Sequence, residues 1–422
     1  MATPKRIMLA TFGSWGDLFP AMALAAELRC RGHDAVLCTS ESHRQKVEAA
    51  GLPFQVIRPD AAPSTAADMA KTMHPRHGPR VVFKEILFPA VRDSYDDLLP
   101  LVKNADMLIS SEVCYASPLV AEKTGVKFVS YALAPISLFS AYDAPAPPQL
   151  PILRLQRLGA PLLPRMFLAV TRRAIAHWWR PVTLVRQQEG LRPAVDPIFI
   201  DKHSTLLNLA MFSPLLGAPQ RDWPPHTVQT GFPFPADRAS ARMPMELAEF
   251  LDAGPPPVVF TLGSSAVYAA GNFYEESLEA VRRLNCRAVL LTGFATGNLA
   301  DRTAPENVLI YPYAPHGVLF ERAAAVVHQG GVGTTAQALA AGKPMLVVPF
   351  SHDQPDNAAR VQRLGVARVI PARKYTAARA AAALKDLLAD TQMRVRAREV
   401  GQQVRAEPGV PAACDAIERI LE

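Results

Sequence analysis

A glycine-rich segment in the last third of the chain contains residue types suited to holding a phosphate group. An apolar stretch ends at His328. Glycine and hydroxyl residues follow it in close succession: Gly330, Gly331, Gly333, Thr334 and Thr335. Glycines let the backbone approach an anion closely, and the unpaired N–H groups at the start of a helix point toward it. The spacing therefore predicts a strand that ends in His328, a phosphate-binding turn and a helix.

A polar loop follows the next apolar stretch, which runs from Met345 to Pro349. This loop carries His352, Asp353 and Gln354. Open α/β sheets bind ligands beyond the carboxyl ends of their strands, and we expect these side chains to lie at that edge. The pattern predicts that a diphosphate and a group attached to it are bound side by side.

The composition limits the kind of partner. The chain has 422 residues, of which 49% are hydrophobic and 20% are charged, which indicates a globular protein. This length predicts two domains of about 200 residues each. The net charge of +7 is compatible with a nucleotide sugar, a membrane surface or a nucleic acid. Because the basic residues are scattered and no nucleic-acid-binding motif accompanies them, we expect no nucleic-acid partner.

The cysteines and the apolar runs indicate a cytoplasmic protein. The five cysteines are dispersed and form no C-x-x-C pair, which is typical of a reducing compartment. The apolar run near the N-terminus is short, and no run of about 18 apolar residues occurs, so we expect neither a signal peptide nor a membrane span.

The first half of the chain alternates between strand and helix patterns. Strands are predicted at residues 6–12, 35–39, 54–57, 107–109 and 128–130, and helices at residues 20–31, 42–50 and 117–123. Repeated βαβ units form parallel sheets with right-handed crossovers. Two insertions, residues 60–79 and 132–164, interrupt the alternation. They are candidate walls of a substrate pocket or, equally, variable surface loops.

A long helix predicted over residues 162–189 combines Trp178 and Trp179 with several arginines. This combination is compatible with peripheral contact at the inner face of a membrane. The alternative is a helix with buried aromatic rings and a solvated basic face.

A proline-rich stretch separates the two halves of the chain, and the strand pattern resumes at residues 258–262. We predict a first domain over residues 1–231, a linker over residues 232–254 and a second domain over residues 255–404. A helix over residues 405–422 can cross back to the first domain. Both domains are expected to be doubly wound α/β sheets, with a cleft between the carboxyl ends of their strands.

The segment HQGGVGTTAQALAAGKPMLVVPFSHDQPDNAARV closely resembles the donor signature of family 1 nucleotide-sugar glycosyltransferases. The resemblance continues in FGSWGDLFP, FSPLLGAPQRDWPPHTVQTGFPF, VVFTLGSSAV and YPYAPHGVLF, and so covers almost the whole chain. It implies the GT-B fold, which consists of two facing Rossmann-like domains. The N-terminal motif is most similar to bacterial sterol- and lipid-type glucosyltransferases and to the rhamnosyltransferase of rhamnolipid synthesis.

The resemblance implies roles for residues that bind the donor. His328 is similar to the histidine that meets the diphosphate, and the glycines and threonines after it would hold the phosphates. Tyr313 would stack on uracil or thymine, and the backbone of Ala314 would bind the edge of the base. Ser264 resembles a serine that contacts a phosphate.

Asp353 and Gln354 align with an acidic-Gln pair that binds the hydroxyls of the donor sugar. Asp353 is also a favoured residue for capping the helix that follows it, and the two roles are compatible. No Asp-x-Asp motif stands at a strand end, so we expect no metal and no cofactor besides the UDP- or TDP-sugar co-substrate. His328, the helix dipole and the threonine hydroxyls would then stabilise the leaving group.

Asp17 lies in the loop where the resemblance places the catalytic base. Inverting transfer needs a base that takes the proton from the acceptor hydroxyl. The ordinary pKa of aspartate is about 3.9, so burial must raise it or the proton must move late. Alternatively, Asp17 caps a helix that begins at Pro20. Members that use a histidine base have a second carboxylate, whose position matches Ser111 here, next to the weaker candidate Glu112.

We therefore predict an inverting, metal-independent glycosyltransferase. It would move a hexose or 6-deoxyhexose from a UDP- or TDP-sugar to a hydroxyl of a lipophilic acceptor such as a lipid, a sterol or a hydroxy fatty acid. Two alternatives stay open: a polyketide or macrolide acceptor, and a non-catalytic partner subunit with the same fold. A nicotinamide-dependent oxidoreductase is excluded because no G-x-G-x-x-G motif follows the first strand.

Overall fold

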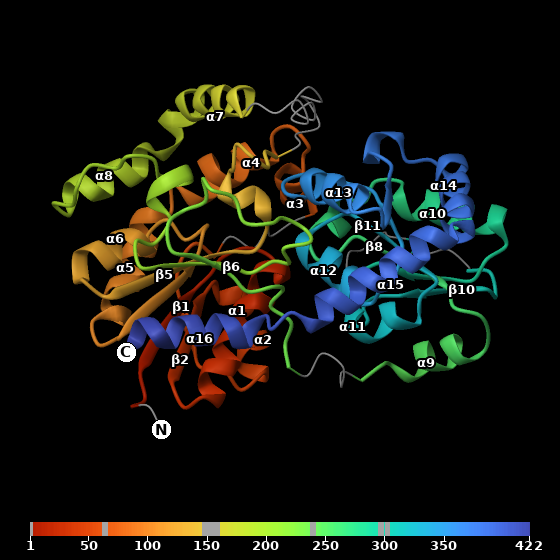
Figure 1. Ribbon diagram of the computed structural model, residues 1–422, viewed down its shortest axis with the longest axis horizontal. Helices are drawn as coiled ribbons and strands as arrows, with labels where there is room; N and C mark the ends of the chain where they lie inside the picture. Colours follow the sequence, from red (N-terminus) through yellow and green to blue (C-terminus); the bar gives the residue numbers. More distant parts are fainter. Residues whose placement is uncertain (1–2, 61–65, 146–160, 237–241, 294–298, 300–303) are drawn as a thin grey trace. The chain divides into compact units, whose positions relative to one another are not determined.

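A computed structural model describes residues 3–60, 66–145, 161–236, 242–293, 299 and 304–422. The chain forms two compact units (Figure 1). Unit 1 consists of Met1–Ala62, Pro79–Pro235 and Glu407–Glu422, and unit 2 consists of Pro63–Gly78 and Ala236–Ala406.

Unit 1 is built on a parallel sheet. Its strands, in the described residues, are β1 (Arg6–Ala10), β2 (Asp34–Thr39), β3 (Phe54–Val56), β4 (Met107–Ser111), β5 (Lys127–Ala132), β6 (Leu207–Ala210) and β7 (Thr227–Gln229). They lie in the order β3-β2-β1-β4-β5-β6-β7, and every pair is parallel. The helices of this unit are α1 (Trp15–Cys30), α2 (Arg44–Ala49), α4 (Gly78–Arg80), α5 (Val91–Val102), α6 (Ser117–Thr124), α7 (Leu162–Ile175), α8 (Arg180–Gln188) and α16 (Val410–Leu421). The parallel sheet predicted for the first half of the chain is confirmed.

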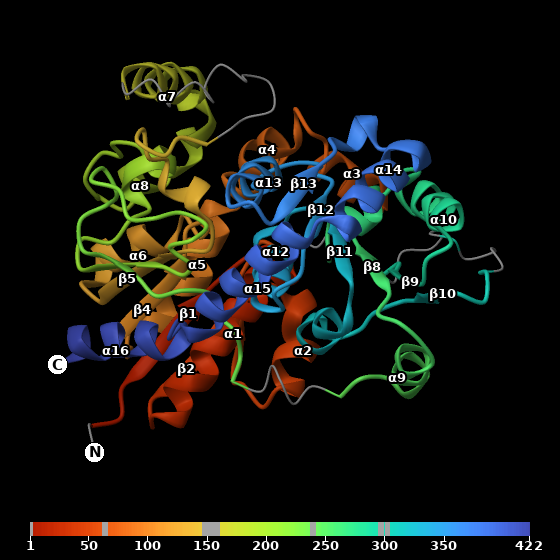
Figure 2. The same cartoon turned by 45° about the vertical axis from the view of Figure 1, so that its right-hand side comes forward.

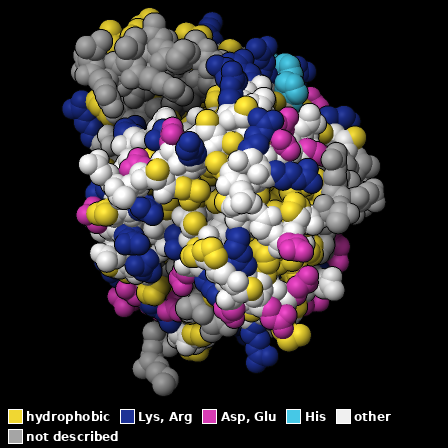
Figure 3. All heavy atoms as spheres, turned by 90° about the vertical axis from the view of Figure 1, so that its right-hand side faces the viewer, with side chains coloured by type: hydrophobic (Ala, Val, Ile, Leu, Met, Phe, Trp, Pro, Cys, Tyr) yellow, Lys and Arg dark blue, Asp and Glu magenta, His cyan; other side chains and the backbone are white. Residues whose placement is uncertain are grey.

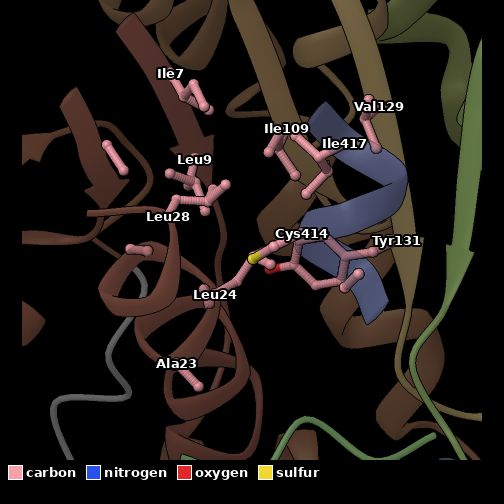
Figure 4. Close-up of a cluster of buried hydrophobic side chains, with 14 of the residues drawn as sticks. Ile7, Leu9, Ala23, Leu24, Leu28, Ile109, Val129, Tyr131, Cys414 and Ile417 are labelled. Carbon is pink, nitrogen blue, oxygen red and sulfur yellow. The ribbon is translucent and has the colours of Figure 1, made fainter. Parts of the chain in front are cut away.

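The C-terminal helix α16 packs on unit 1, beside α1 (Figures 1 and 2). Its Cys414 and Ile417 are buried in the same apolar cluster as Leu24 of α1 and Ile109 of β4 (Figure 4). Arg31, just after α1, donates to Asp415 and Glu418 of α16 at 2.6 and 2.7 Å. The end of the chain therefore completes the core of the unit in which the chain begins.

Helix α1 begins five residues earlier than predicted. The prediction that it starts at Pro20 is wrong because Ser14 and Asp17 form a capping box that starts the helix at Trp15. Pro20 is accommodated inside the helix.

The long helix predicted over residues 162–189 is interrupted. A short 3-10 segment, Ala176–Trp179, separates α7 from α8. Pro181 explains the break, since it has no N–H to donate to His177 and its ring would clash with that carbonyl in a continuous helix.

Unit 2 repeats the architecture of unit 1. Its strands, again in the described residues, are β8 (Val258–Thr261), β9 (Ala288–Leu291), β10 (Val308–Tyr311), β11 (Ala325–His328), β12 (Met345–Val347) and β13 (Ala367–Val369). Their order is β10-β9-β8-β11-β12-β13, with all pairs parallel. The helices are α3 (Ala66–Thr72), α9 (Met245–Asp252), α10 (Phe273–Leu284), α11 (His316–Leu319), α12 (Val332–Ala340), α13 (Gln354–Arg363), α14 (Ala377–Ala389) and α15 (Thr391–Ala406). Helix α10 packs on α14, and α12 packs on α15 (Figure 2).

Helix α3 belongs to unit 2, although it comes from the first half of the chain. It packs against a short 3-10 helix, Ala266–Ala269, that follows β8. Met73, at its end, is buried in the apolar cluster that contains Phe260 and Leu262. This differs from the prediction that residues 1–231 form one domain. Met73 anchors the segment in unit 2, and the sequence around Met73 does not show which residues it will contact.

The helices and the surface bear on contact with a membrane. No helix of the described residues combines the length and the apolar character that crossing a bilayer requires. On the face seen in Figure 3, lysine and arginine side chains are interspersed with acidic and apolar ones.

Candidate active site

Each sheet has one point at which its strand order reverses, and ligands of open α/β sheets bind at the carboxyl ends of the strands beside such a point. In unit 2 the reversal lies between β8 and β11, where Ser264 follows β8 and His328 ends β11. In unit 1 it lies between β1 and β4, where Asp17 and Glu112 follow the two strands. The predicted site residues therefore lie at two corresponding places, one in each unit.

His328 is a buried, neutral hydrogen-bond donor. Its side chain is fully buried, and burial lowers its pKa to about 3. The backbone N–H of Gly330 donates to Nδ1 at 3.1 Å, so the ring proton is assigned to Nε2. Nε2 has no hydrogen-bond partner among the described residues. A buried donor without a partner is costly, and an oxygen of a bound phosphate would satisfy it.

The turn after His328 requires glycine. Gly330 has a φ of +89°, and a Cβ there would lie 2.9 Å from Cγ1 of Val347 and 3.1 Å from the carbonyl oxygen of Gln354. Gly331 is the N-cap residue of α12 and provides no side chain to cap it. Helix α12 starts at Val332, two residues before the predicted start at Thr334.

The first turn of α12 leaves two backbone N–H groups without a backbone acceptor in the described residues. The N–H of Val332 donates to Oδ2 of Asp353 at 3.1 Å. The N–H groups of Gly333 and Thr334 donate no backbone hydrogen bond within the described residues. Gly333 is exposed, and no atom of another described segment lies within 4 Å of the position that a Cβ would take. This turn can hold an anion.

Two amide side chains near the turn were not predicted. Gln329 fills the space beside Gly263 and Gly331, where a Cβ would come within 2.4 and 2.8 Å of its Nε2. Asn357 donates from Nδ2 to the carbonyl oxygen of Gly330 at 2.9 Å. Gln329 Oε1, Asn357 Oδ1 and Thr335 Oγ1 are buried without a partner among the described residues. The signal for Asn357 was its spacing of four residues from Asp353 on a helix.

Asp353 and Gln354 make hydrogen bonds within the protein that stabilise the turn, besides any bond to a ligand. Asp353 occupies the N-cap position of α13 but makes no capping bond to that helix. Its Oδ2 instead accepts from the N–H of Val332 and from Nδ2 of Asn357, at 3.1 and 2.7 Å. The suggestion that Asp353 caps the following helix is therefore wrong, and it caps α12. Oε1 of Gln354 accepts two backbone N–H groups of its own loop, which leaves Nε2 as the group that can reach a ligand.

The residues expected to bind the base and a phosphate lie on loops of unit 2. Tyr313 is 38% exposed, and partial burial raises the pKa of its hydroxyl. Ala314 is buried, and its backbone N–H and C=O make no backbone hydrogen bond within the described chain. Ser264 is half-buried in the turn after β8.

Asp17 lies in the first turn of α1, so the prediction that it lies in a loop is wrong. It is the third residue of the helix rather than its N-cap, which is Ser14. The backbone N–H and Oγ of Ser14 donate to Oδ2 of Asp17 at 2.8 and 3.2 Å. Burial nevertheless raises the pKa of Asp17 from 3.8 to about 6, against the lowering effect of the Ser14 bonds, and the charge of Glu112 raises it further.

Glu112 is held by a lysine that was not predicted. Nζ of Lys202 donates to Oε2 of Glu112 at 2.7 Å and to the carbonyl oxygen of Ser137 at 3.0 Å. The side chain of Lys202 is only 5% exposed. Ser111 lies against Cys114, with Oγ 3.5 Å from Sγ. Asp17 follows β1 and Glu112 follows β4. Glu112 is paired with a lysine, whereas Asp17 forms no ion pair in the described residues.

The two sites offer complementary chemistry. A carboxyl with a pKa of about 6 is ionised at neutral pH and more basic than an ordinary aspartate, so it can accept a proton. Neutral N–H donors at a helix start can stabilise a developing negative charge. Within the described part of the chain, no three His, Cys, Asp or Glu side chains are grouped so as to hold a metal ion.

Two Rossmann-like units of this kind define the GT-B class of glycosyltransferases, and comparisons with known proteins agree. Residues 7–136 match the glycosyltransferase family 28 N-terminal domain, and residues 276–418 match the C-terminal domain of erythromycin biosynthesis protein CIII-like proteins. The chain is 34% identical to O-mycaminosyltylonolide 6-deoxyallosyltransferase of Streptomyces fradiae, over 99% of this chain and 98% of that protein. The chain therefore belongs to the family 1-type GT-B glycosyltransferases.

Further similar proteins extend this assignment. A sterol 3-beta-glucosyltransferase of Emericella nidulans is 30% identical over the whole of this chain, which spans 30% of that longer protein. Among solved structures, the glycotransferase of kitacinnamycin has a TM-score of 0.74 at 23% identity, and each chain is fully covered. The glycosyltransferase VinC, solved in complex with DTDP, has a TM-score of 0.69 at 20% identity over 99% of both chains. At these identities the two structures show the fold alone.

Proposed function

We propose that this glycosyltransferase is inverting and metal-independent, and that it moves a hexose or 6-deoxyhexose from a TDP- or UDP-sugar to a hydroxyl of a large apolar acceptor. One observation carries the proposal. The neutral Nε2–H of His328 is buried without a partner among the described residues, beside a helix start whose N–H groups are also available. These donors suit the oxygens of a diphosphate.

The donor site works by hydrogen bonding at the leaving group. As the bond between the sugar and the diphosphate breaks, negative charge grows on the diphosphate. His328 and the N–H groups of Gly333 and Thr334 donate to that charge, and the dipole of α12 adds to the effect. Asp353 and the Nε2 of Gln354 are proposed to bind hydroxyls of the sugar, and Tyr313 the base.

Asp17 is proposed to act as the base. The acceptor hydroxyl attacks the anomeric carbon from the face opposite the diphosphate, and its proton passes to the carboxylate of Asp17. Both bonds from Ser14 use Oδ2, which leaves Oδ1 for the proton. Glu112 is neutralised by Lys202 and would not compete for this role.

The names of similar proteins support the choice of substrates. VinC and the spinosyn rhamnosyltransferase SpnG were solved with thymidine diphosphate or DTDP, which supports a TDP-sugar donor. The Streptomyces fradiae relative is named for a tylonolide acceptor, and several other relatives for sterols. We propose a macrolide- or polyketide-type alcohol as acceptor, with a sterol as the second candidate.

Peripheral contact with a membrane is a further part of the proposal if the acceptor is a membrane lipid. Helix α7 exposes Leu162, Leu163, Met166 and Val170. Its arginines would favour anionic lipid headgroups. Co-sedimentation with phosphatidylglycerol vesicles, compared with phosphatidylcholine vesicles, would test this contact.

The decisive experiment is a binding and transfer screen. TDP, UDP and their hexose and 6-deoxyhexose conjugates are titrated by calorimetry, and the binding donors are then incubated with macrolide aglycones and sterols. Transfer is read as the mass increase of one sugar residue, and the anomeric configuration of the product by NMR. Retention of configuration, or an absence of nucleotide-sugar binding, would contradict the proposal.

A further inference from the structure

The loop that carries Asp353 and Gln354 is held by a segment from the first half of the chain. We call residues 350–354 the sugar loop and residues 66–78 the strap. Both belong to unit 2. The strap consists of α3 and the turn that follows it.

Two hydrogen bonds join the sugar loop to the strap. Nε2 of His352 is 2.8 Å from the carbonyl oxygen of Thr72, and Oγ of Ser351 donates to the carbonyl oxygen of His74 at 3.1 Å. His352 has a φ of +56°, a left-handed conformation that costs energy for a residue other than glycine. The bond to Thr72 offsets this cost, so the strap stabilises an otherwise unfavourable loop conformation.

The geometry of the strap is itself restricted. The N–H of Gly78 donates to the carbonyl oxygen of His74 at 2.8 Å. A Cβ at Gly78 would lie 2.1 Å from the carbonyl oxygen of Thr72 and 3.0 Å from Oγ of Ser351. Met73 anchors the strap in the apolar core of unit 2. The carbonyl groups of Thr72 and His74, which accept the two hydrogen bonds, are thus held by Met73 on one side and by Gly78 on the other.

The strap also contacts the segment that follows β8, which lies on the other side of β11 from β12. Helix α3 packs on the 3-10 helix Ala266–Ala269, which directly follows the turn of Ser264. One segment therefore supports both the loop after β8 and the sugar loop after β12.

We propose that the strap is a positioning element for the donor sugar, and that Ser351 and His352 set donor-sugar selectivity by fixing the sugar loop to it. This inference rests on the proposed function and deepens it. Ser351 and His352 donate to the strap, and Asp353 and Gln354 are the residues of the loop proposed to bind sugar hydroxyls. The strap thereby fixes the positions of the side chains of Asp353 and Gln354.

The test separates sugar recognition from nucleotide recognition. In His352→Ala and Ser351→Ala, we expect the KM for the nucleotide sugar to rise about tenfold for each lost hydrogen bond. Discrimination between UDP-glucose and UDP-galactose, or the corresponding TDP-sugars, should fall. The Kd of free UDP or TDP should stay within about twofold of wild type, since the turn after His328 is intact.

Matched variants keep the result interpretable. His352→Gln can retain a donor at the distance of Nε2, and we expect it to recover most of the selectivity that His352→Ala loses. His177→Gln makes the same kind of exchange at an exposed side chain of unit 1, outside the strap and the sugar loop, and should leave selectivity unchanged. Gly78→Ala should displace the carbonyl of Thr72, crowd Oγ of Ser351 and so reduce selectivity without a substitution in the sugar loop itself.

Two outcomes would overturn the proposal. If wild type discriminates between the sugars and His352→Ala does so equally well, the strap has no role in selectivity. If free nucleotide and nucleotide sugar lose affinity to the same extent, the strap supports the fold of unit 2 and not sugar recognition. A wild-type protein that binds no nucleotide sugar would instead overturn the proposed function, and this inference with it.

Discussion

The first turns of α1 and α12 are similar pieces of structure with opposite electrostatic character. Each follows the strand beside the reversal point of its sheet, β1 in unit 1 and β11 in unit 2. Their second residues are both glycine, Gly16 and Gly333. The N-cap residue is Ser14 in α1 and Gly331 in α12.

The difference lies in how each helix start is satisfied. In α1, Ser14 accepts the N–H of Gly16, and the third residue, Asp17, accepts the N–H of Ser14. In α12 no residue of the helix caps it, and Asp353, which precedes α13, accepts the N–H of Val332. The start of α1, capped by its own residues, thus holds a carboxylate, while the start of α12, capped at Val332 alone, is left able to bind an anion. The same kind of strand-turn-helix segment, once in unit 1 and once in unit 2, is thus proposed to provide the base and the leaving-group site.

The largest expected effect comes from removing the carboxylate of α1. In Asp17→Asn, we expect kcat to fall by about 100-fold to 10,000-fold, because the variant cannot accept the proton. The amide oxygen can still accept from Ser14, so the helix start is kept. Calorimetry should show unchanged affinity for the nucleotide. Near-normal turnover would show that Asp17 is only a capping residue.

The same variant tests the raised pKa through stability. Because the folded pKa of Asp17 is above its unfolded value, its protonated form is favoured by folding. The stability that this provides is present below the unfolded value of 3.8 and is lost as the pH rises through about 6. Asp17→Asn should therefore be more stable than wild type at pH 8 and not at pH 4, as measured by thermal unfolding.

The second effect concerns the anion site of α12. In His328→Ala, we expect the affinity for TDP or UDP to fall about 10-fold to 100-fold, the usual cost of a lost hydrogen bond to a charged group. His328→Gln can keep a donor, and we expect it to lose less. The Kd values are measured by calorimetry at a temperature where unfolding scans show both variants folded. Equal Kd values in wild type and both variants would show that His328 does not bind the diphosphate.

The third effect compares the two glycines directly. In Gly333→Ala, the new methyl group would contact no other described segment of the protein. Alanine also favours helix over glycine by about 1 kcal/mol, so the variant should fold. Its methyl group would stand over the first turn, and we expect nucleotide affinity to fall several-fold.

Gly16→Ala is the matched control, since it makes the same change at the same position of α1, where Oγ of Ser14 would be 3.3 Å from the new Cβ. It should leave nucleotide affinity unchanged. Loss of affinity in both variants, or in neither, would contradict the assignment of the anion site to α12.

The sequence predicted the strands and the glycine turn better than it predicted the helix starts. Buried parallel strands are continuous apolar runs, so β1 and β11 were found within a few residues. The predicted start of α1 at Pro20 is wrong because proline often begins a helix, whereas here the Ser14 capping box starts the helix earlier. Asp17 and His328 were singled out from motifs. Lys202 was not, because its partner Glu112 is 90 residues away and only the fold brings them together.

The smallest expected effect comes from weakening the cap of α1 while Asp17 is kept. In Ser14→Ala, the Oγ that accepts the N–H of Gly16 and donates to Asp17 is lost, at a cost of about 1 kcal/mol in the free energy of unfolding. The Ser14 bonds lower the pKa of Asp17, so their partial loss should raise it further. If Asp17 is the base, the acid limb of the pH profile of kcat, expected near pH 6, moves to higher pH, while nucleotide affinity stays constant. An acid limb that does not move, in a variant with the expected loss of stability, would show that another group titrates there and that the self-capped turn of α1 serves only the fold.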